Sequence, residues 1–350
     1  MKKSDVIETI FSSTVQLAME HHGEGMEHED SLLFSLPKRE KGLAYAPTNI
    51  ALCKYWGKRD TEINLPMTSS LSIALPDKGA MTALSLSTTG SDIVILNGDE
   101  LGPDSGFVTR VSEFLDLFRI GHKWQLKIDI NMNIPVAAGL ASSACGFASI
   151  VAAMNDMFDW KLSLPHLSIL ARLGSGSAAR SFWNGFVEWH AGTNSDGMDC
   201  YAEPLDYTWN DLCVGILSVN HEEKAISSRD AMLRTVNSSA LYPSWPKKVA
   251  QDLAILKHAI KSRNFALMAG TSESNALAMH ATMLSSWPPV CYFQPDTIAA
   301  MHKIWKLRAE GLNVFFTQDA GPNLKLLFVD KDKNSVKQHF PDVEIIKVFE

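Results

Sequence analysis

The sequence predicts an α+β protein of two domains, each containing a mainly antiparallel sheet. Two observations lead to this prediction. The chain has 350 residues, which is enough for two domains of roughly 100–200 residues each. Segments with strand and helix patterns alternate through both halves, and turn signals such as Asn97-Gly98 close some of them. We expect an N-terminal extension over residues 1–43, a first domain over 44–207 and a second over 208–350.

The composition is typical of a folded globular protein, with 46% hydrophobic and 20% charged residues. The formal net charge of -7 argues against a globally basic surface for nucleic acid, although one cleft can still be basic. The sequence contains no run of 18 or more apolar residues, so we expect no membrane span. The five cysteines have no C-x-x-C spacing, and no signal peptide is evident, so we expect a reducing, cytoplasmic setting.

The extension has two parts. Val6 and Ile10 belong to an apolar series that predicts a short amphipathic helix. Residues 21–30 contain three histidines among carboxylates, but their spacing matches no metal motif. We interpret this second part as a solvated segment.

In the first domain, the strands are predicted from alternating or short apolar runs and the helices from longer periodic ones. The turn at residues 76–79 separates two of the strands, because it combines proline, aspartate and glycine. Asn97-Gly98 closes another strand as a hairpin. The predicted strands are 71–75, 81–86, 93–96, 125–130 and 183–190, and the predicted helices are 108–118, 145–157 and 167–173.

In the second domain, a new strand begins at Leu212, after the boundary that residues 204–210 suggest. Asp319 then lies on a tight Gly-Pro turn between two apolar strands. An aspartate there is either a turn residue or a general base. The predicted strands are 212–219, 314–317 and 324–329, and the predicted helices are 249–268, 272–284 and 298–309.

Residues 133–144 join the strand at 125–130 to the helix that follows. Gly139 permits a positive φ angle, and Ser142 and Ser143 lie where the helix begins. Unpaired N–H groups and the helix dipole attract an anion at such a helix end. The residues are equally compatible with an ordinary junction whose serines cap the helix. No Gly-Lys-Ser/Thr follows the glycine, so the segment is not the common P-loop.

Three further segments combine cations with small or aromatic residues. Residues 54–60 hold three cations and two aromatic rings, which suits either an anion site or a solvated turn. Residues 174–181 alternate glycine and serine before Arg180, which favours an anion site because a guanidinium can bind a carboxylate through two hydrogen bonds. Residues 224–230 repeat the serine and arginine chemistry, although alone they indicate a helix N-cap.

Together these segments resemble the mevalonate diphosphate decarboxylase family of the GHMP kinase superfamily. The resemblance runs from about Ala44 to Phe328 and preserves the order of the family's motifs. The motifs are Ala46-Pro47-Thr48-Asn49-Ile50-Ala51, residues 54–60, Asn64-Leu65-Pro66, Ser69-Ser70-Leu71-Ser72, residues 135–144, residues 174–180, Ser227-Ser228-Arg229, Ser274-Asn275 with His280-Ala281-Thr282, Pro288-Pro289 and residues 319–323.

The resemblance implies a GHMP kinase fold with two α/β sandwich-like domains and the active site in the cleft between them. It implies that ATP and Mg²⁺ phosphorylate the 3-hydroxyl of mevalonate 5-diphosphate. Loss of phosphate and CO₂ would then give isopentenyl diphosphate in the mevalonate pathway of isoprenoid biosynthesis. It also implies a homodimer.

Site residues follow from the same resemblance, position by position. Asp319 is implied as the base, with Lys58 supporting its carboxylate and neutralising charge near the phosphates. Arg180 is implied to hold the substrate carboxylate, and Ser143 to serve both catalysis and the metal. The residues implied around the diphosphate are Tyr55, Lys58, Ser175, Ser177, Ser228 and Arg229, and those around ATP are Pro135, Ala138, Gly139, Leu140, Ser142 and Ser143.

One position departs from the family pattern. An arginine is expected near Phe107, counted from Leu96-Asn97-Gly98, but the nearest one is Arg110. The alternatives are therefore a phosphomevalonate decarboxylase or a mevalonate 3-kinase-like relative. A catalytically inactive binding protein on the same fold is a further alternative of another class.

Overall fold

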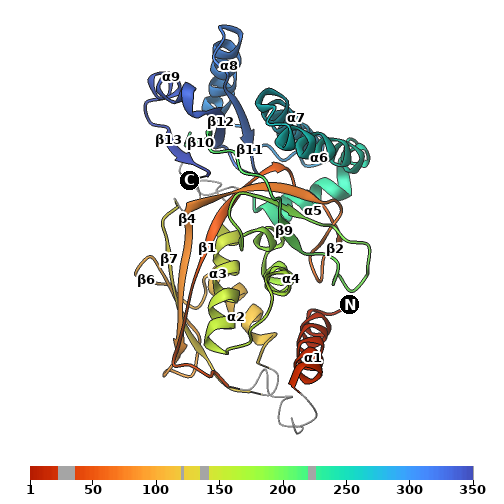
Figure 1. Cartoon of the computed structure of the whole chain (residues 1–350), viewed down its shortest axis with the longest axis vertical. Helices are drawn as coiled ribbons and strands as arrows, with labels where there is room; N and C mark the ends of the chain where they lie inside the picture. Colours follow the sequence, from red (N-terminus) through yellow and green to blue (C-terminus); the bar gives the residue numbers. More distant parts are fainter. Residues whose placement is uncertain (23–35, 120–121, 135–141, 220–225, 350) are drawn as a thin grey trace.

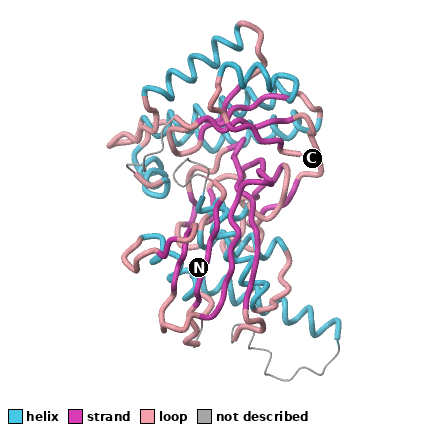
Figure 2. Tube along the Cα trace, turned by 90° about the vertical axis from the view of Figure 1, so that its left-hand side faces the viewer, coloured by secondary structure: helices cyan, strands magenta, loops and turns pink. Residues whose placement is uncertain are grey.

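The computed structural model describes residues 1–22, 36–119, 122–134, 142–219 and 226–349. Two sheets lie one above the other along the long axis of the molecule, each accompanied by helices (Figures 1 and 2). Almost all strand pairs are antiparallel, and helices and strands are mixed through both halves. The predicted α+β class with mainly antiparallel sheets is therefore confirmed. The predicted domain boundary at residue 207 falls between the last strand of the first sheet and the first strand of the second.

Among the described residues, the first sheet has seven strands in the order β6-β5-β7-β4-β8-β9, with β1 paired to β4. Only β5 and β7 are parallel within it. A separate small hairpin follows β1. The strands are β1 (Lys41–Cys53), β4 (Ser70–Leu86), β5 (Ile93–Leu96), β6 (Asp99–Glu100), β7 (Leu126–Met132), β8 (Phe186–Trp189) and β9 (Ala202–Pro204), and the hairpin is β2 (Lys58–Asp60) with β3 (Leu65–Pro66).

The turn predicted at residues 76–79 is wrong, because β4 runs through this segment without interruption. The strand pairs with β1 along its length, and the register shifts inside the segment. On its other side β4 pairs with β8 through residues 70–73 and with β7 through residues 80–86. Pro76 thus lies where the strand changes partner, and such an irregularity tolerates a residue without an N–H donor.

Helix α3 (Ser142–Met157) packs against β1 and β4 and forms the centre of the first domain. It is apolar on almost every side, as a helix enclosed by other elements must be. Phe147 and Ile150 on it are almost fully buried. The neighbouring elements are α2 (Gly106–Asp116), α4 (Leu164–Gly174) and the short 3₁₀ helix η2 (Gly176–Arg180).

The extension contains helix α1 (Lys3–His22), as its apolar series predicts. Val6, Ile7, Ile10 and Phe11 are at most 2% exposed. The Phe11 ring meets the ring of Trp160 edge-on, with 5.0 Å between centroids. Helix α1 is therefore packed on the first domain. Most of the histidine-containing stretch at residues 21–30 lies outside the described residues.

The second sheet has the order β11-β12-β10-β13, and all its pairs are antiparallel. Its helices lie around it at the upper end of the molecule in Figure 1. The strands are β10 (Leu212–Leu217), β11 (Phe315–Gln318), β12 (Leu324–Val329) and β13 (Glu344–Lys347), and the helices are α5 (Ser228–Ser238), α6 (Trp245–Lys261), α7 (Phe265–Leu284), α8 (Pro295–Ala309) and α9 (Lys333–His339), with short 3₁₀ turns η3 (Tyr242–Ser244) and η4 (Asp330–Asp332).

The break between α6 and α7 lies earlier than predicted. The sequence predicts a helix to residue 268, but α6 ends at Lys261 and α7 begins at Phe265. Arg263 between them has a φ of 49°, which no helix contains. Asn264 caps α7, because its side chain accepts a hydrogen bond from the Leu267 N–H. Apolar periodicity alone does not reveal this local signal. None of the helices described is long and apolar enough to cross a membrane.

Candidate active site

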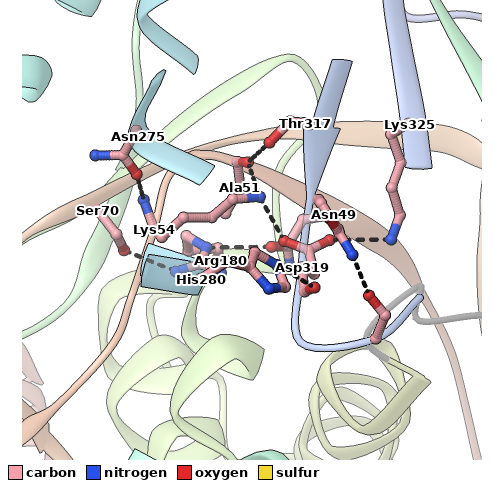
Figure 3. Close-up of polar contacts among 12 residues, drawn as sticks. Asn49, Ala51, Lys54, Ser70, Arg180, Asn275, His280, Thr317, Asp319 and Lys325 are labelled. Atoms are coloured by element: carbon pink, nitrogen blue, oxygen red, sulfur yellow. Dashed lines mark hydrogen bonds and ion pairs between the residues drawn. The ribbon is translucent and has the colours of Figure 1, made fainter. Parts of the chain in front are cut away.

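Asp319 lies between the two halves of the molecule, directly after β11 (Figure 3). Lys54 Nζ is 2.7 Å from its Oδ1, and Lys325 Nζ is 3.4 Å from its Oδ2. Both lysines are only 1% exposed. Burial would raise the pKa of Asp319, but the two ammonium groups together outweigh it and hold the pKa below its usual value. Asp319 is therefore a carboxylate at neutral pH.

The lysine that supports Asp319 is Lys54, and the expectation for Lys58 is wrong on this point. Lys54 directly follows β1 and also donates to the Ala51 carbonyl at 2.8 Å. Burial lowers the pKa of Lys54, and Asp319 opposes that shift. Gly57, with a φ of 110°, then turns the chain into β2, so Lys58 points elsewhere. Its Nζ donates to Asn64 Oδ1 at 2.6 Å.

His280 on α7 also contacts the Asp319 segment, and it had no assigned role in the sequence analysis. Its Nε2 is 3.2 Å from the Asp319 carbonyl oxygen, which can only accept, so Nε2 carries the proton. The ring stacks on Phe293 with 4.8 Å between centroids. Burial, helped by the charge of Lys54, lowers the pKa of His280 to about 3. A neutral histidine thus fixes the backbone that carries the carboxylate.

Arg180 ends η2 and is held from two sides (Figure 3). Its Nε donates to Asn49 Oδ1 at 3.1 Å, and its Nη1 donates to Ser70 Oγ at 2.7 Å. The side chain is 3% exposed. Burial lowers its pKa to about 10, while Asp319 opposes the shift, so the guanidinium stays charged at neutral pH. Nε and Nη1 each donate one hydrogen bond within the protein, so the second N–H of Nη1 and the N–H groups of Nη2 are the donors that can meet a ligand.

Three of the predicted serines form a row. Ser143 Oγ in the first turn of α3 lies 3.4 Å from Ser175 Oγ, which lies 3.4 Å from Ser177 Oγ. Two segments separated by some 30 residues of sequence therefore present hydroxyl groups together at the amino end of a long helix, which suits an anion. Pro135, Ala138, Gly139 and Leu140 lie outside the described residues. Ser142 is the first residue of α3.

Tyr55 has a buried hydroxyl with no hydrogen-bond partner in the described part of the chain. Its ring packs edge-on against Trp189, with 4.9 Å between centroids. Burial raises the pKa of Tyr55, so the hydroxyl keeps its proton. The hydroxyl lies so close to Gly176 that a side chain there would collide with it. A buried donor without a partner indicates that a ligand supplies one.

A group of cations lies beyond Tyr55. Arg229 and Ser228 are exposed at the start of α5, and its N-cap, Ser227, lies within the segment predicted to hold one. Burial, then the charges of Arg229 and Lys3, lower the pKa of Lys58 to about 8. Burial and Arg229 also lower the pKa of Arg110. The charge of Arg110 on α2 thus interacts with that of Arg229, and Arg110 is close in sequence to the place where the pattern lacks an arginine.

Comparisons with known proteins agree on one family. Residues 46–202 match the family model of the diphosphomevalonate decarboxylase-like N-terminal domain, and residues 214–347 match that of the mevalonate 5-diphosphate decarboxylase C-terminal domain. Diphosphomevalonate decarboxylase mvd1 of Aspergillus fumigatus is 36% identical over 313 residues, covering 83% of this chain and 77% of the relative. The chain belongs to the diphosphomevalonate decarboxylase family. The Saccharomyces cerevisiae decarboxylase is 33% identical over 311 residues, covering 83% and 78%.

Solved structures of this decarboxylase family share the fold. The mevalonate diphosphate decarboxylase of Staphylococcus aureus has a TM-score of 0.83 and 36% identity, covering 89% of this chain and 96% of the other. A structure described as MDDEF in complex with MVAPP, AMPPCP and magnesium has a TM-score of 0.83 and 39% identity, covering 88% and 97%. The predicted family and GHMP kinase fold are confirmed. The extension at residues 1–43 lies outside both family models.

Proposed function

We propose that this chain catalyses the ATP-dependent decarboxylation of mevalonate 5-diphosphate to isopentenyl diphosphate, ADP, phosphate and CO₂. Membership of the decarboxylase family supports the reaction. The observation that carries it is the Asp319 carboxylate, which Lys54 and Lys325 hold beside the buried cation Arg180. The site thus contains an acceptor for a hydroxyl proton and a donor for a carboxylate.

Asp319 orients the tertiary 3-hydroxyl and receives its proton. A carboxylate with a low pKa is a weak base, but it is unprotonated at neutral pH and ready to accept a hydrogen bond. In a loose phosphoryl-transfer transition state the alcohol keeps its proton until the new P–O bond is largely formed. A weak, well-placed base is then sufficient, and the two lysines fix its position.

Arg180 holds the carboxylate of the substrate through its Nη1–Nη2 edge. When the 3-phosphate leaves, positive charge develops at C3, and the C–C bond to the carboxylate supplies the electrons of the new double bond. CO₂ is released as the electrons of that C–C bond move into the new double bond to C3. Asn49 and Ser70 keep the guanidinium in place while its partner changes from carboxylate to CO₂.

The amino end of α3 is suited to the phosphates of ATP, which supplies the phosphoryl group. Ser142 and Ser143 offer hydroxyl and backbone donors there. In the part of the chain described, no group of three or more histidine, cysteine, aspartate or glutamate residues is arranged so that it could hold a metal ion. This fits Mg²⁺, which is commonly held by phosphates, waters and few protein oxygens, with the Ser143 hydroxyl as one ligand. The diphosphate of the substrate takes the donors of Tyr55, Lys58, Ser175, Ser177, Ser228 and Arg229.

Binding of the diphosphate should weaken as the pH rises through about 8. Lys58 in the empty site has a pKa lowered to about 8, so above this pH its ammonium is lost and one charge-assisted contact with it. The bound diphosphate favours the charged form, so kcat should not show this limb. The kcat/KM profile should fall above pH 8 and flatten in Lys58→Arg, because arginine stays charged. A wild-type profile that stays level to pH 9.5 would remove Lys58 from the diphosphate site.

Arg180→Lys should lower kcat/KM for the diphosphate substrate by about 10- to 100-fold. A lysine cannot keep both the Asn49 and Ser70 contacts and still offer two parallel donors, a loss of about 1–3 kcal/mol. Arg234→Lys is a matched control, since Arg234 is a partly exposed residue of α5 whose hydrogen bond to the described part of the chain goes to the Pro288 carbonyl. Steady-state kinetics with both variants tests the role, and an unchanged Arg180→Lys enzyme would exclude it.

The substrate itself is tested by comparing two acceptors. Purified protein with ATP and Mg²⁺ should form ADP with mevalonate 5-diphosphate at a kcat/KM well above that with mevalonate 5-phosphate. Preference for the monophosphate would instead indicate a phosphomevalonate decarboxylase. The homodimer and the cytoplasmic location stay predictions, which sedimentation analysis and cell fractionation can test.

A further inference from the structure

Asn64, in the hairpin of β2 and β3, is a buried polar residue with no assigned role in the reaction. It opens the motif Asn64-Leu65-Pro66 and is 3% exposed. Its φ of 56° is a left-handed conformation, which asparagine adopts more readily than most residues. A buried amide needs partners for both its donor and its acceptor, so those partners indicate what the side chain does.

The carboxyl end of α4 orients this amide. Asn64 Nδ2 donates to the Arg172 carbonyl at 2.9 Å and to the Leu173 carbonyl at 3.2 Å. Carbonyl groups in the last turn of a helix have no partner within the helix, so the amide satisfies two of them. Because a carbonyl oxygen can only accept, Nδ2 must face α4, and Oδ1 must face the other way.

Oδ1 of Asn64 faces Lys58. The Lys58 ammonium donates to it at 2.6 Å, and the lysine is partly buried. An ammonium has three N–H groups, and a neutral amide oxygen fixes its direction without cancelling its charge. The other N–H groups of Lys58 can therefore bind an anion.

The end of α4 also holds the serines proposed for the diphosphate. Ser175 is the C-cap of α4, and its N–H donates to the Ala171 carbonyl at 3.0 Å. Ser175 Oγ in turn lies 3.4 Å from Ser177 Oγ. One helix end thus holds the serines directly and Lys58 through Asn64, although the two segments are far apart in the sequence.

The hairpin is attached to α4 by a second contact, which does not involve the Asn64 side chain. Arg172 is fully buried, and its Nε donates to the Ile63 carbonyl at 3.1 Å. Its Nη1 donates to the Gly197 carbonyl at 2.7 Å and to the Cys200 carbonyl at 2.6 Å. The backbone around residue 64 is therefore held in place independently of the amide.

We propose that Asn64 is a positioning residue that holds the Lys58 ammonium toward the substrate diphosphate. The inference rests on the proposed function, because Lys58 acts there as a ligand of the diphosphate. A lysine oriented in this way loses its side-chain entropy during folding rather than on binding. The benefit is tighter binding of the diphosphate, and the chemical step does not depend on it.

Asn64→Gly tests this role with little change to the backbone, because glycine adopts a φ of 56° without strain. Asn97→Gly is the matched control. Asn97 has a φ of 53° in the turn between β5 and β6, and its Oδ1 accepts from the Met132 N–H at 2.7 Å. Both variants lose a hydrogen-bonded asparagine side chain at a left-handed position, but only the first loses a contact with Lys58. Thermal unfolding checks that both are folded.

Asn64→Gly should raise KM for mevalonate 5-diphosphate by about 3- to 10-fold, as expected for the loss of one hydrogen bond, with kcat nearly unchanged. Calorimetry should show a similar loss of affinity for inorganic pyrophosphate. Asn97→Gly should change neither quantity.

A double-mutant cycle distinguishes positioning of Lys58 from a merely structural role. Lys58→Met removes the ammonium, so adding Asn64→Gly to it should change KM and pyrophosphate affinity by less than about 2-fold. A structural role would cost the same factor with and without Lys58.

Asn64→Asp provides an independent readout, because it places a carboxylate where the amide oxygen meets Lys58. The opposite charge favours the ammonium and raises the pKa of Lys58. Lys58 then keeps its proton to a higher pH, so the descending limb of kcat/KM near pH 8 should move to higher pH. Asn97→Asp should leave this limb in place.

Several outcomes overturn the inference. They are an Asn64→Gly enzyme with unchanged KM and pyrophosphate affinity, the same defect in Asn97→Gly, full additivity with Lys58→Met, or a folded Asn64→Asp enzyme whose descending limb stays in place. Failure of the proposed function looks different. In that case the unmodified chain binds pyrophosphate more tightly than Asn64→Gly does, but forms no ADP with mevalonate 5-diphosphate.

Discussion

Asp319→Asn should abolish most turnover, with kcat lower by about 10²- to 10⁴-fold, the usual contribution of a general base. The amide has nearly the same shape but cannot accept the hydroxyl proton. Binding of a non-hydrolysable ATP analogue should be nearly unchanged, because the serine row at α3 is formed by other residues. Steady-state ADP formation and calorimetry measure the two effects separately. Turnover close to that of the unmodified chain would contradict the role of Asp319 as base.

The same substitution should also lower stability. Lys54 and Lys325 are 1% exposed and would lose the carboxylate that lies between them. Removing one partner of a buried ionic group destabilises a protein by about 3–5 kcal/mol. Kinetics must therefore be measured where the variant is folded, as shown by thermal unfolding. Asp330→Asn is the control, since Asp330 is near the surface and pairs with Lys347 at 3.7 Å; it should leave turnover unchanged.

Lys54→Met should lower kcat by about 10²-fold or more, the size of effect seen when one preorganised donor is removed from an active site. It removes the nearer ammonium from Asp319 and its hydrogen bond of 2.7 Å. The effect of burial on the carboxyl is then opposed without Lys54, the cation that lowers its pKa most, so the pKa of Asp319 rises. A higher pKa means that the carboxyl becomes protonated at a higher pH, so the acidic limb of the rate profile moves to higher pH.

Lys58→Met distinguishes the role of Lys58 from that of Lys54. Lys58 bonds to Asn64 and faces Arg229, so its loss should raise KM for the diphosphate and leave the acidic limb in place. The pH dependence of kcat/KM in both variants distinguishes these results. An acidic limb that moves in Lys58→Met but stays in Lys54→Met would contradict the assignment of Lys54 to Asp319.

The sequence could predict those elements that local signals determine. Asn97-Gly98 closes the hairpin between β5 and β6 through two positive φ angles, and Ser227 caps α5. The continuity of β4 could not be predicted, because it depends on β1, β7 and β8 lying alongside a segment that resembles a turn. The short strand β13 at the sheet edge was missed as well, since its four residues show no clear alternation.

In the site, too, local sequence patterns predicted some residues, whereas others depended on how the chain folds. Glycine, serine and arginine patterns indicated the segments of Ser143, Ser175 and Arg180, and the structure brings those side chains near one another or near Asp319. The choice between Lys54 and Lys58 depended on the direction of the chain at Gly57, which spacing does not reveal. One signal in the sequence could have identified the lysines that hold Asp319. Lys54 and Lys325 are each a charged residue beside apolar strand residues, and a buried charge needs a partner of opposite sign.

The most direct test of the account is the stoichiometry of products in one reaction with mevalonate 5-diphosphate, ATP and Mg²⁺. ADP, phosphate and CO₂ should be released in equal amounts, because phosphorylation of the 3-hydroxyl, with Asp319 as base, is followed by loss of phosphate and CO₂ beside Arg180. ADP formation without phosphate and CO₂ would contradict the account, since it would show a kinase that stops at the phosphorylated intermediate.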